Sequence, residues 1–138
     1  MSGTNGTIDG GCLCGAVRYQ ASGGAYGITH CHCRTCRRAS GAAFVTWAGF
    51  DSEKFKFTKG QPASYASSRD VLRTFCSRCG SALTYQRADT PGSIDVTLGS
   101  MDDPERLQPE DHTWTESQIS WIMLNDRLPA YPQQRRLN

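Results

Sequence analysis

Three cysteines fall within six residues in the segment Cys31-His32-Cys33-Arg34-Thr35-Cys36-Arg37-Arg38, together with one histidine and three arginines. No other segment of the 138-residue chain carries so many reactive side chains. The other four of the seven cysteines form two close pairs, Cys12/Cys14 upstream and Cys76/Cys79 downstream. An odd number of cysteines, arranged as a triplet and two pairs, favours metal coordination over a disulfide framework.

The two outer pairs predict one structural zinc site. A tetrahedral structural zinc needs four soft ligands, which distant chain segments usually supply as two pairs. The Cys-x-x-Cys pair at Cys76 and Cys79 is the strongest form of such a pair, and the Cys-x-Cys pair at Cys12 and Cys14 is a tighter version; a glycine follows each. Together the two pairs would close a Cys₄ site that joins the N-terminal strand to a central hairpin.

The central triplet of Cys31, Cys33 and Cys36 predicts a second zinc with one open coordination position. Three protein ligands and an open position are the arrangement of a catalytic zinc. A fourth ligand from His30 or His32 would close the site, although a histidine in such a loop more often orients its neighbours or faces solvent.

A competing arrangement pairs Cys33 and Cys36 with Cys76 and Cys79 as one Cys₄ site, because Cys-x-x-Cys pairs commonly associate. It would leave the other three cysteines without a shared role. An iron–sulfur cluster is disfavoured, since the spacings do not match the ferredoxin patterns.

Three thiolates make a zinc ion soft and electron-rich. Such a site is poor at generating hydroxide and well suited to a fourth sulfur, so a substrate thiol would bind as a nucleophilic thiolate. Arg34, Arg37 and Arg38 could offset the negative charge and hold substrate carboxylates by paired hydrogen bonds, or they could form a solvated loop face. The chemistry indicates a small thiol that carries carboxylates, for which glutathione is the abundant candidate.

The remainder of the chain predicts a mainly-β domain with at most short helical turns, because short alternating segments are separated by glycine turns. We expect a flexible leader at 1–9, one zinc domain at 10–130 and a loosely packed tail at 131–138. The expected strands are residues 16–20, 26–30, 42–50, 54–58, 64–66, 71–75, 81–86 and 93–98.

The C-terminal third carries weaker signals. Residues 102–107 suit one helical turn, 112–116 could add an edge strand, and 119–124 suit a short amphipathic segment with Trp121 buried. We expect Phe44, Trp47 and Phe50 to form core rather than a pocket wall. We expect His112 to be structural or to face solvent.

Composition supports a single globular domain in a reducing compartment. Hydrophobic residues make up 38% of the chain and charged residues 20%, and the formal charge of +2 is too small to indicate nucleic acid or a membrane surface as a partner. The polar first eleven residues do not resemble a signal peptide, and no apolar run of membrane-spanning length is present. These features predict a cytoplasmic protein.

Four motifs carry a family resemblance. They are Gly-Gly-Cys-Leu-Cys-Gly-Ala-Val-Arg-Tyr at 10–19, Cys-His-Cys-Arg-Thr-Cys-Arg-Arg-Ala-Ser-Gly-Ala-Ala-Phe at 31–44, Phe-Cys-Ser-Arg-Cys-Gly at 75–80 and Leu-Gly-Ser-Met-Asp-Asp-Pro at 98–104. The chain resembles the glutathione-dependent formaldehyde-activating enzyme family, also called the centromere protein V/Gfa domain. The resemblance covers roughly residues 10–130.

The resemblance implies a zinc-bearing Mss4-like β-tent and carbon–sulfur lyase chemistry, in which glutathione adds reversibly to formaldehyde to give S-hydroxymethylglutathione. Other family members are described as chromatin- or microtubule-associated, so a non-catalytic, zinc-stapled protein-binding module is the alternative. The resemblance implies two zinc ions per chain, a structural one at Cys12, Cys14, Cys76 and Cys79 and a catalytic one at Cys31, Cys33 and Cys36.

Overall fold

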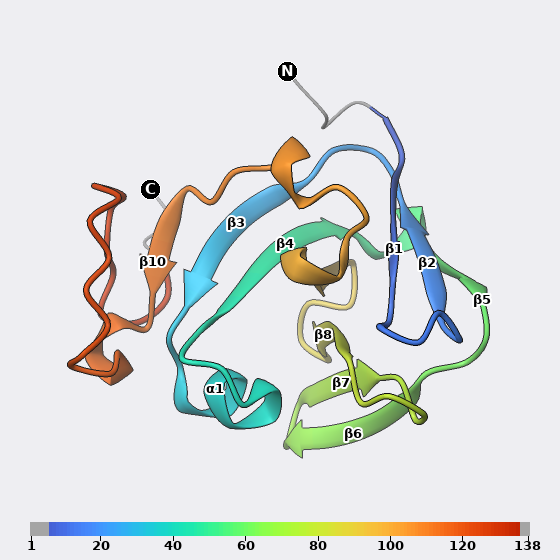
Figure 1. The fold of residues 1–138 in the computed structure, drawn as a ribbon, viewed down its shortest axis with the longest axis horizontal. Helices are drawn as coiled ribbons and strands as arrows, with labels where there is room; N and C mark the ends of the chain where they lie inside the picture. Colours follow the sequence, from blue (N-terminus) through green and yellow to red (C-terminus); the bar gives the residue numbers. More distant parts are fainter. Residues whose placement is uncertain (1–5, 136–138) are drawn as a thin grey trace.

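The computed structural model describes residues 6–135 and contains ten β-strands, one α-helix and several 3₁₀ turns (Figure 1). Each 3₁₀ turn is three residues long, at Ser52–Lys54, Leu98–Ser100, Pro104–Arg106 and Thr115–Ser117. The helix and strands are β1 (Ile8–Gly11), β2 (Arg18–Ala21), β3 (Tyr26–Cys31), α1 (Arg34–Ser40), β4 (Val45–Asp51), β5 (Phe55–Lys59), β6 (Ala63–Ser68), β7 (Val71–Phe75), β8 (Ala82–Arg87), β9 (Ser93–Thr97) and β10 (Asp111–Thr113).

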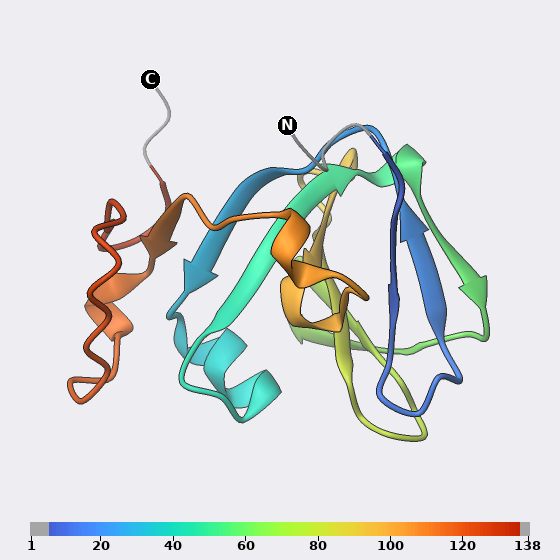
Figure 2. The same ribbon diagram turned by 45° about the horizontal axis from the view of Figure 1, so that its top comes forward.

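The strands form two sheets. The small sheet has the order β1-β2-β5, and the large sheet has the order β10-β3-β4-β9-β8-β7-β6. Every pair is antiparallel except β10 and β3, which run parallel. Figure 2 shows the small sheet standing beside the curved large sheet. The hydrophobic core joins Ile8, Tyr19 and Ala21 of the small sheet to Phe50 and Leu83 of the large one.

The two faces of the large sheet carry different side chains: one face contributes to the hydrophobic core, and the other carries polar and aromatic side chains. Side chains alternate across a strand, so Ala48, Phe50 and Val96 point into the core while their neighbours point the other way. Cross-strand partners share a face, and the pairs Thr29–Trp47, Trp47–Thr97, Tyr85–Asp95 and Arg73–Tyr85 are all opposite one another. We call the face that carries these side chains the pocket face, because the candidate site lies on it.

The mainly-β prediction is confirmed, and the predicted strands match the observed ones to within a few residues. The finer Mss4-like assignment stays a prediction. No helix in residues 6–135 is long and apolar enough to cross a membrane.

The cysteine triplet lies at the start of a helix, so the prediction of a loop over 31–38 is wrong. Cys33 is the N-cap of α1, and its sulfur accepts a hydrogen bond from the backbone N–H of Cys36. Gly41 ends the helix in the left-handed conformation, with φ of 68°, and its N–H donates to the carbonyl oxygen of Arg37. Cysteine is not among the usual capping residues, which explains why the sequence pattern did not indicate a helix start here.

The predicted burial of Trp121 is also wrong, because this side chain is 70% exposed. Residues 119–124 form no strand or helix, and the backbone bond from Ile122 to Ile119 marks only a turn. An apolar pattern of six residues is too short to establish a packed face.

The two ends of the described segment, residues 6–135, contact the rest of the fold. Strand β1 begins at Ile8, inside the segment assigned to the leader, and Ile8 is buried. The first part of the expected tail runs beside β10: the Tyr131 N–H donates to the carbonyl oxygen of His112, and Arg135 forms an ion pair with the buried Asp111. Residues 1–5 and 136–138 lie outside the described residues.

The difference in burial between two leucines on neighbouring strands makes a stability prediction. Leu83 is fully buried in the core, whereas Leu72 on the neighbouring strand is 45% exposed. We expect Leu83→Ala to lower the free energy of unfolding by about 2 to 5 kcal/mol through lost burial and a residual cavity. Leu72→Ala is the matched control and should cost less than about 1 kcal/mol. Urea unfolding of the metal-loaded proteins measures both, and equal losses would contradict the burial of Leu83 in the core.

Candidate metal centres

The outer cysteines meet in one group. The sulfurs of Cys12, Cys14, Cys76 and Cys79 all lie within 4.8 Å of one another. The turn between β1 and β2 supplies the first pair, and the turn of the β7–β8 hairpin supplies the second. The Cys12–Cys14 and Cys14–Cys76 sulfur separations are 3.7 and 3.8 Å. A tetrahedral zinc with Zn–S bonds of about 2.3 Å separates its sulfurs by about 3.8 Å, so the donor set fits this ion.

Hydrogen bonds favour the thiolate form of two of these sulfurs, those of Cys12 and Cys79. The Val17 N–H donates to the sulfur of Cys12 at 3.2 Å. Burial opposes ionisation of Cys12, but this bond and the neighbouring sulfurs lower its pKa below the ordinary value. The Ser81 hydroxyl lies 3.2 Å from the sulfur of Cys79, and hydrogen bonds from Ser81 lower the pKa of Cys79 to about 5.

The central cysteines form a second, separate group. The sulfurs of Cys31, Cys33 and Cys36 lie within 4.8 Å of one another, where β3 ends and α1 begins. Hydrogen bonds from Cys31 and Cys36 hold the pKa of Cys33 far below its usual range. Since Cys33 and Cys36 associate with Cys31, the alternative pairing with the β7–β8 turn does not form.

Neither nearby histidine completes the central group, and each has another partner. His30 Nδ1 lies 2.7 Å from the hydroxyl of Thr46. His32 is fully buried, and its Nε2 lies 2.9 Å from Nδ1 of His112, whose Nε2 lies 2.8 Å from Asp126. This chain of bonds ties the cysteine triplet to the C-terminal segment, in line with a structural role for His112.

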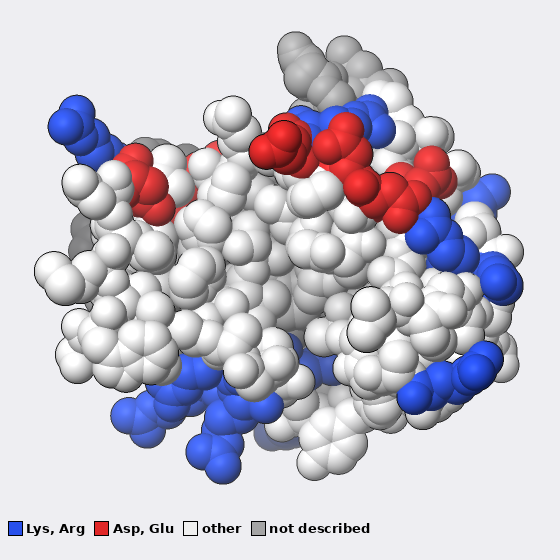
Figure 3. Space-filling view, in the orientation of Figure 1, with Lys and Arg blue, Asp and Glu red and all other residues white. Residues whose placement is uncertain are grey.

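The three arginines of the triplet segment do not act as one unit. Arg34 lines the pocket beside the cysteines. Arg37 donates to the carbonyl oxygen of Ser117 at 3.4 Å, and Arg38 is exposed one helical turn beyond Arg34, lining a shallow hollow with Trp121. Figure 3 shows basic side chains gathered in the region where Figure 1 places α1.

A buried arginine from a different strand contacts the triplet, and the sequence analysis missed it. Arg73 on β7 is only 8% exposed. Its Nη2 lies 3.6 Å from the sulfur of Cys36 and 3.2 Å from the hydroxyl of Thr35, and its guanidinium stacks over the ring of Tyr85 at 4.9 Å. No carboxylate in residues 6–135 pairs with it. A buried cation needs an anion, and the cysteine group is the one within reach.

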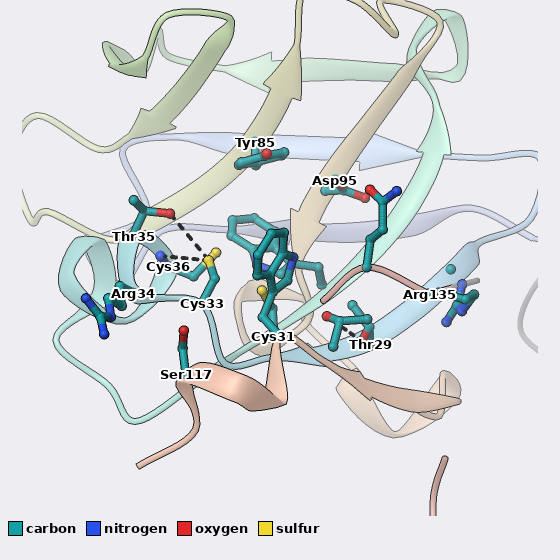
Figure 4. Close-up of a pocket in the computed structure, with 15 residues that line it drawn as sticks. Thr29, Cys31, Cys33, Arg34, Thr35, Cys36, Tyr85, Asp95, Ser117 and Arg135 are labelled. Atoms are coloured by element: carbon teal, nitrogen blue, oxygen red, sulfur yellow. Dashed lines mark hydrogen bonds between the residues drawn. The ribbon is translucent and has the colours of Figure 1, made fainter. Parts of the chain in front are cut away.

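The triplet opens onto a pocket of about 470 Å³ on the pocket face of the large sheet. In Figure 4, Arg34 and Arg135 lie at opposite ends of the pocket, the cysteines lie between them, and Tyr85 and Asp95 lie along one side. Trp47 is buried in a small cluster with Cys31 and Cys36, as expected of a core residue, and it also lines this pocket. Phe50 is in the core as expected, and Phe44 is half-buried against His30.

The fold and the sulfur geometry define a mainly-β protein with two cysteine groups, each able to hold a metal ion. The chain belongs to the glutathione-dependent formaldehyde-activating enzyme family, whose model matches residues 7–117.

Individual relatives agree with this family. A Halomonas elongata protein, provisionally named a glutathione-dependent formaldehyde-activating enzyme, is 29% identical over 141 residues, which cover 92% of this chain and 90% of the relative. A Schizosaccharomyces pombe protein named an uncharacterised lyase is 31% identical over 93 residues, covering 65% of this chain and 66% of that protein. A crystal structure of a Rhodobacter sphaeroides protein shares the fold, with a TM-score of 0.57 and 20% identity over 89% of this chain and 98% of that one.

The contact between Arg73 and Cys36 makes a second prediction. Removing the guanidinium leaves the negative sulfur group without its buried counter-charge, so we expect Arg73→Met to release metal from the triplet about 10-fold faster or more. A chromophoric chelator in excess measures the release from the protein as isolated. Arg38→Met is the control, because this exposed arginine has no contact with a sulfur among the described residues. Equal release from both variants would contradict the prediction.

Proposed function

We propose that this protein is a zinc-dependent carbon–sulfur lyase. It adds a small thiol reversibly to formaldehyde or another small aldehyde, and glutathione is the first thiol to test. The observation that carries the proposal is the three-sulfur group of Cys31, Cys33 and Cys36, which opens onto a pocket in a chain of this family. The lyase name of the S. pombe relative supports the same class of reaction.

We further propose that two zinc ions bind, one at each cysteine group. Four sulfurs complete a tetrahedral set at the outer group, which suits a structural role. Three sulfurs leave one position at the central group, and zinc bound there supplies a soft centre that favours a substrate sulfur over water.

The side chains of the pocket suit a thiol that carries charge. Arg34 stands at the pocket end nearest Cys33 and can hold a substrate carboxylate by two parallel hydrogen bonds (Figure 4). Arg37 and Arg38 extend the positive field outward over α1 and would attract an anionic thiol before it enters. Trp47 and Tyr85 provide an aromatic wall that excludes water from the reacting carbon.

The proposed reaction replaces the π bond of the aldehyde carbonyl with a carbon–sulfur bond. The thiolate sulfur attacks the aldehyde carbon, a carbon–sulfur bond forms, and the carbonyl π electrons move to oxygen, which then takes a proton. The reverse reaction returns the electron pair of the carbon–sulfur bond to sulfur.

A reducing, cytoplasmic location is part of the proposal. All seven cysteines are unpaired in the structure. A reducing compartment keeps such thiols available as metal ligands.

Cobalt substitution tests the open site. We expect the absorption bands of the Co²⁺-substituted protein to change when glutathione is added, because a fourth sulfur enters the central group. S-methylglutathione is the matched control, since it lacks the free thiol and should leave the bands unchanged. Spectra that ignore glutathione would indicate two closed sites and favour the protein-binding module.

Exchange NMR tests the reaction. We expect the protein to accelerate exchange between free glutathione plus formaldehyde and their adduct, and Cys33→Ser to abolish the acceleration because it removes one of the three sulfurs. The thermal midpoint of Cys33→Ser should fall by less than that of Cys14→Ser, which opens the group that joins the β1–β2 turn to the β7–β8 hairpin. No acceleration by the wild type, or full acceleration by Cys33→Ser, would refute the proposal.

A further inference from the structure

Asp95 carries a carboxyl group in an unusual place, on β9 in the middle of the large sheet. Strand β4 separates β9 from β3. Asp95 lies on the pocket face of β9, opposite Tyr85 of β8 and Gly49 of β4. Gly49 has no side chain, and the ring of Tyr26 from β3 packs against the position that a side chain there would take. Asp95 lines the same pocket as the three central cysteines (Figure 4).

The carboxyl group of Asp95 has no structural partner. Among residues 6–135 it forms neither an ion pair nor a side-chain hydrogen bond, whereas the carboxyl group of Asp111 at the other side of the site is paired with Arg135. Burial without a compensating charge is costly, so a carboxylate with only a structural task would be expected to have a partner. Burial raises the pKa of Asp95 to about 6, close to neutrality.

The charged groups around Asp95 come from several elements. Tyr85 faces it from β8, where Arg87 lies two residues further along and is paired with Asp89. On the other side, β4 carries Asp51 two residues beyond Gly49, and the hydroxyl of Tyr26 lies 3.4 Å from Asp51. Across the pocket lie Arg34, the cysteine triplet and Arg135, the last of which is paired with Asp111. None of these groups binds the carboxyl group of Asp95 in this structure, so it is free to accept a proton from a molecule in the pocket.

We propose that Asp95 is the catalytic residue that transfers the proton in the thiol–aldehyde reaction. The inference rests on the proposed function, which lacks a proton donor and acceptor without it. In the splitting direction, the ionised carboxyl group removes the proton from the hydroxyl of the adduct. The oxygen electrons form the carbonyl, the carbon–sulfur bond breaks, and its electron pair leaves with sulfur beside the cysteine triplet. In the addition direction, the protonated carboxyl group returns the same proton to the developing alkoxide.

A near-neutral pKa suits both directions, because a useful fraction of each protonation state is present at physiological pH. The splitting reaction needs the ionised form. Its rate should therefore rise as pH increases through about 6 and level off above that value. An exposed aspartate, with its pKa near the ordinary value, would be a much weaker base at the same pH.

Asp95→Asn tests this role with the smallest change of shape. We expect the protein-dependent splitting rate, measured by exchange NMR after subtracting the protein-free rate, to fall by about 10²-fold or more. The pH dependence near 6 should disappear, while the response of the cobalt bands to glutathione stays. Asp70→Asn is the control, because Asp70 is an exposed turn residue outside the pocket and should behave as wild type.

Formate rescue of Asp95→Ala supplies a second measurement that does not depend on the asparagine variant folding well. Formate can enter the vacated space and act as the base, so the rate should increase with formate concentration. In the wild type, the ¹³C signal of the Asp95 carboxyl carbon should titrate near 6 without any substrate present.

The main rival role for Asp95 is an anchor for the ammonium group of glutathione. This role predicts weaker binding of glutathione with an unchanged rate at saturation, and no defect with 3-mercaptopropionate, which has no ammonium group. That result would overturn the proton-transfer role, as would full activity of Asp95→Asn or no rescue by formate. A wild type without activity would refute the proposed function and this inference together, whereas an active wild type with an equally active Asp95→Asn would refute only the inference.

Discussion

The central constraint on this structure is the mutual repulsion of closely spaced sulfurs that must be deprotonated to bind metal. Three sulfurs within 4.8 Å cannot all carry charge unless positive charge lies close by. A bound metal ion meets most of this need. The protein meets part of it with the N–H groups at the start of α1 and with the buried guanidinium of Arg73. Arg73 in turn is tolerable inside the protein because the sulfur group is negative, so the two features depend on each other.

The alternation of side chains across the large sheet separates stability from chemistry. Ala48, Phe50 and Val96 point into the core, while their sequence neighbours Trp47 and Asp95 point into the pocket. The same strands therefore build both regions, and a shift of one residue in register would exchange them. The outer cysteine group fixes the turns at the ends of β1 and β7, so a metal ion there would hold the small sheet against the large one.

Much of this arrangement could be predicted from the sequence, because it depends on local spacing. The four-plus-three division of the cysteines follows from their separation along the chain, and the strands follow from alternation. Arg73 and Asp95 could not be placed beside the triplet, since their proximity depends on the register of β7, β8 and β9. The sequence does contain one signal for Arg73: it alternates with Val71 and Phe75, so it occupies the same face as two apolar side chains. Cys33 as a helix cap was hidden because the cap uses sulfur in place of oxygen.

Arg73 and Asp95 place a fixed positive charge and a titratable carboxyl group at different positions on the pocket face. The fixed positive charge of Arg73 lies against Cys36 at the sulfur end, where negative charge must be held throughout the reaction. The titratable carboxyl group of Asp95 lies on the sheet wall, where no fixed charge binds it. Tyr85 connects the two, since its ring lies under the guanidinium and opposite Asp95 in the strand pairing. In the proposed reaction, Arg73 would balance negative charge at the sulfurs and Asp95 would carry the transferable proton, two tasks that reversible addition to a carbonyl requires.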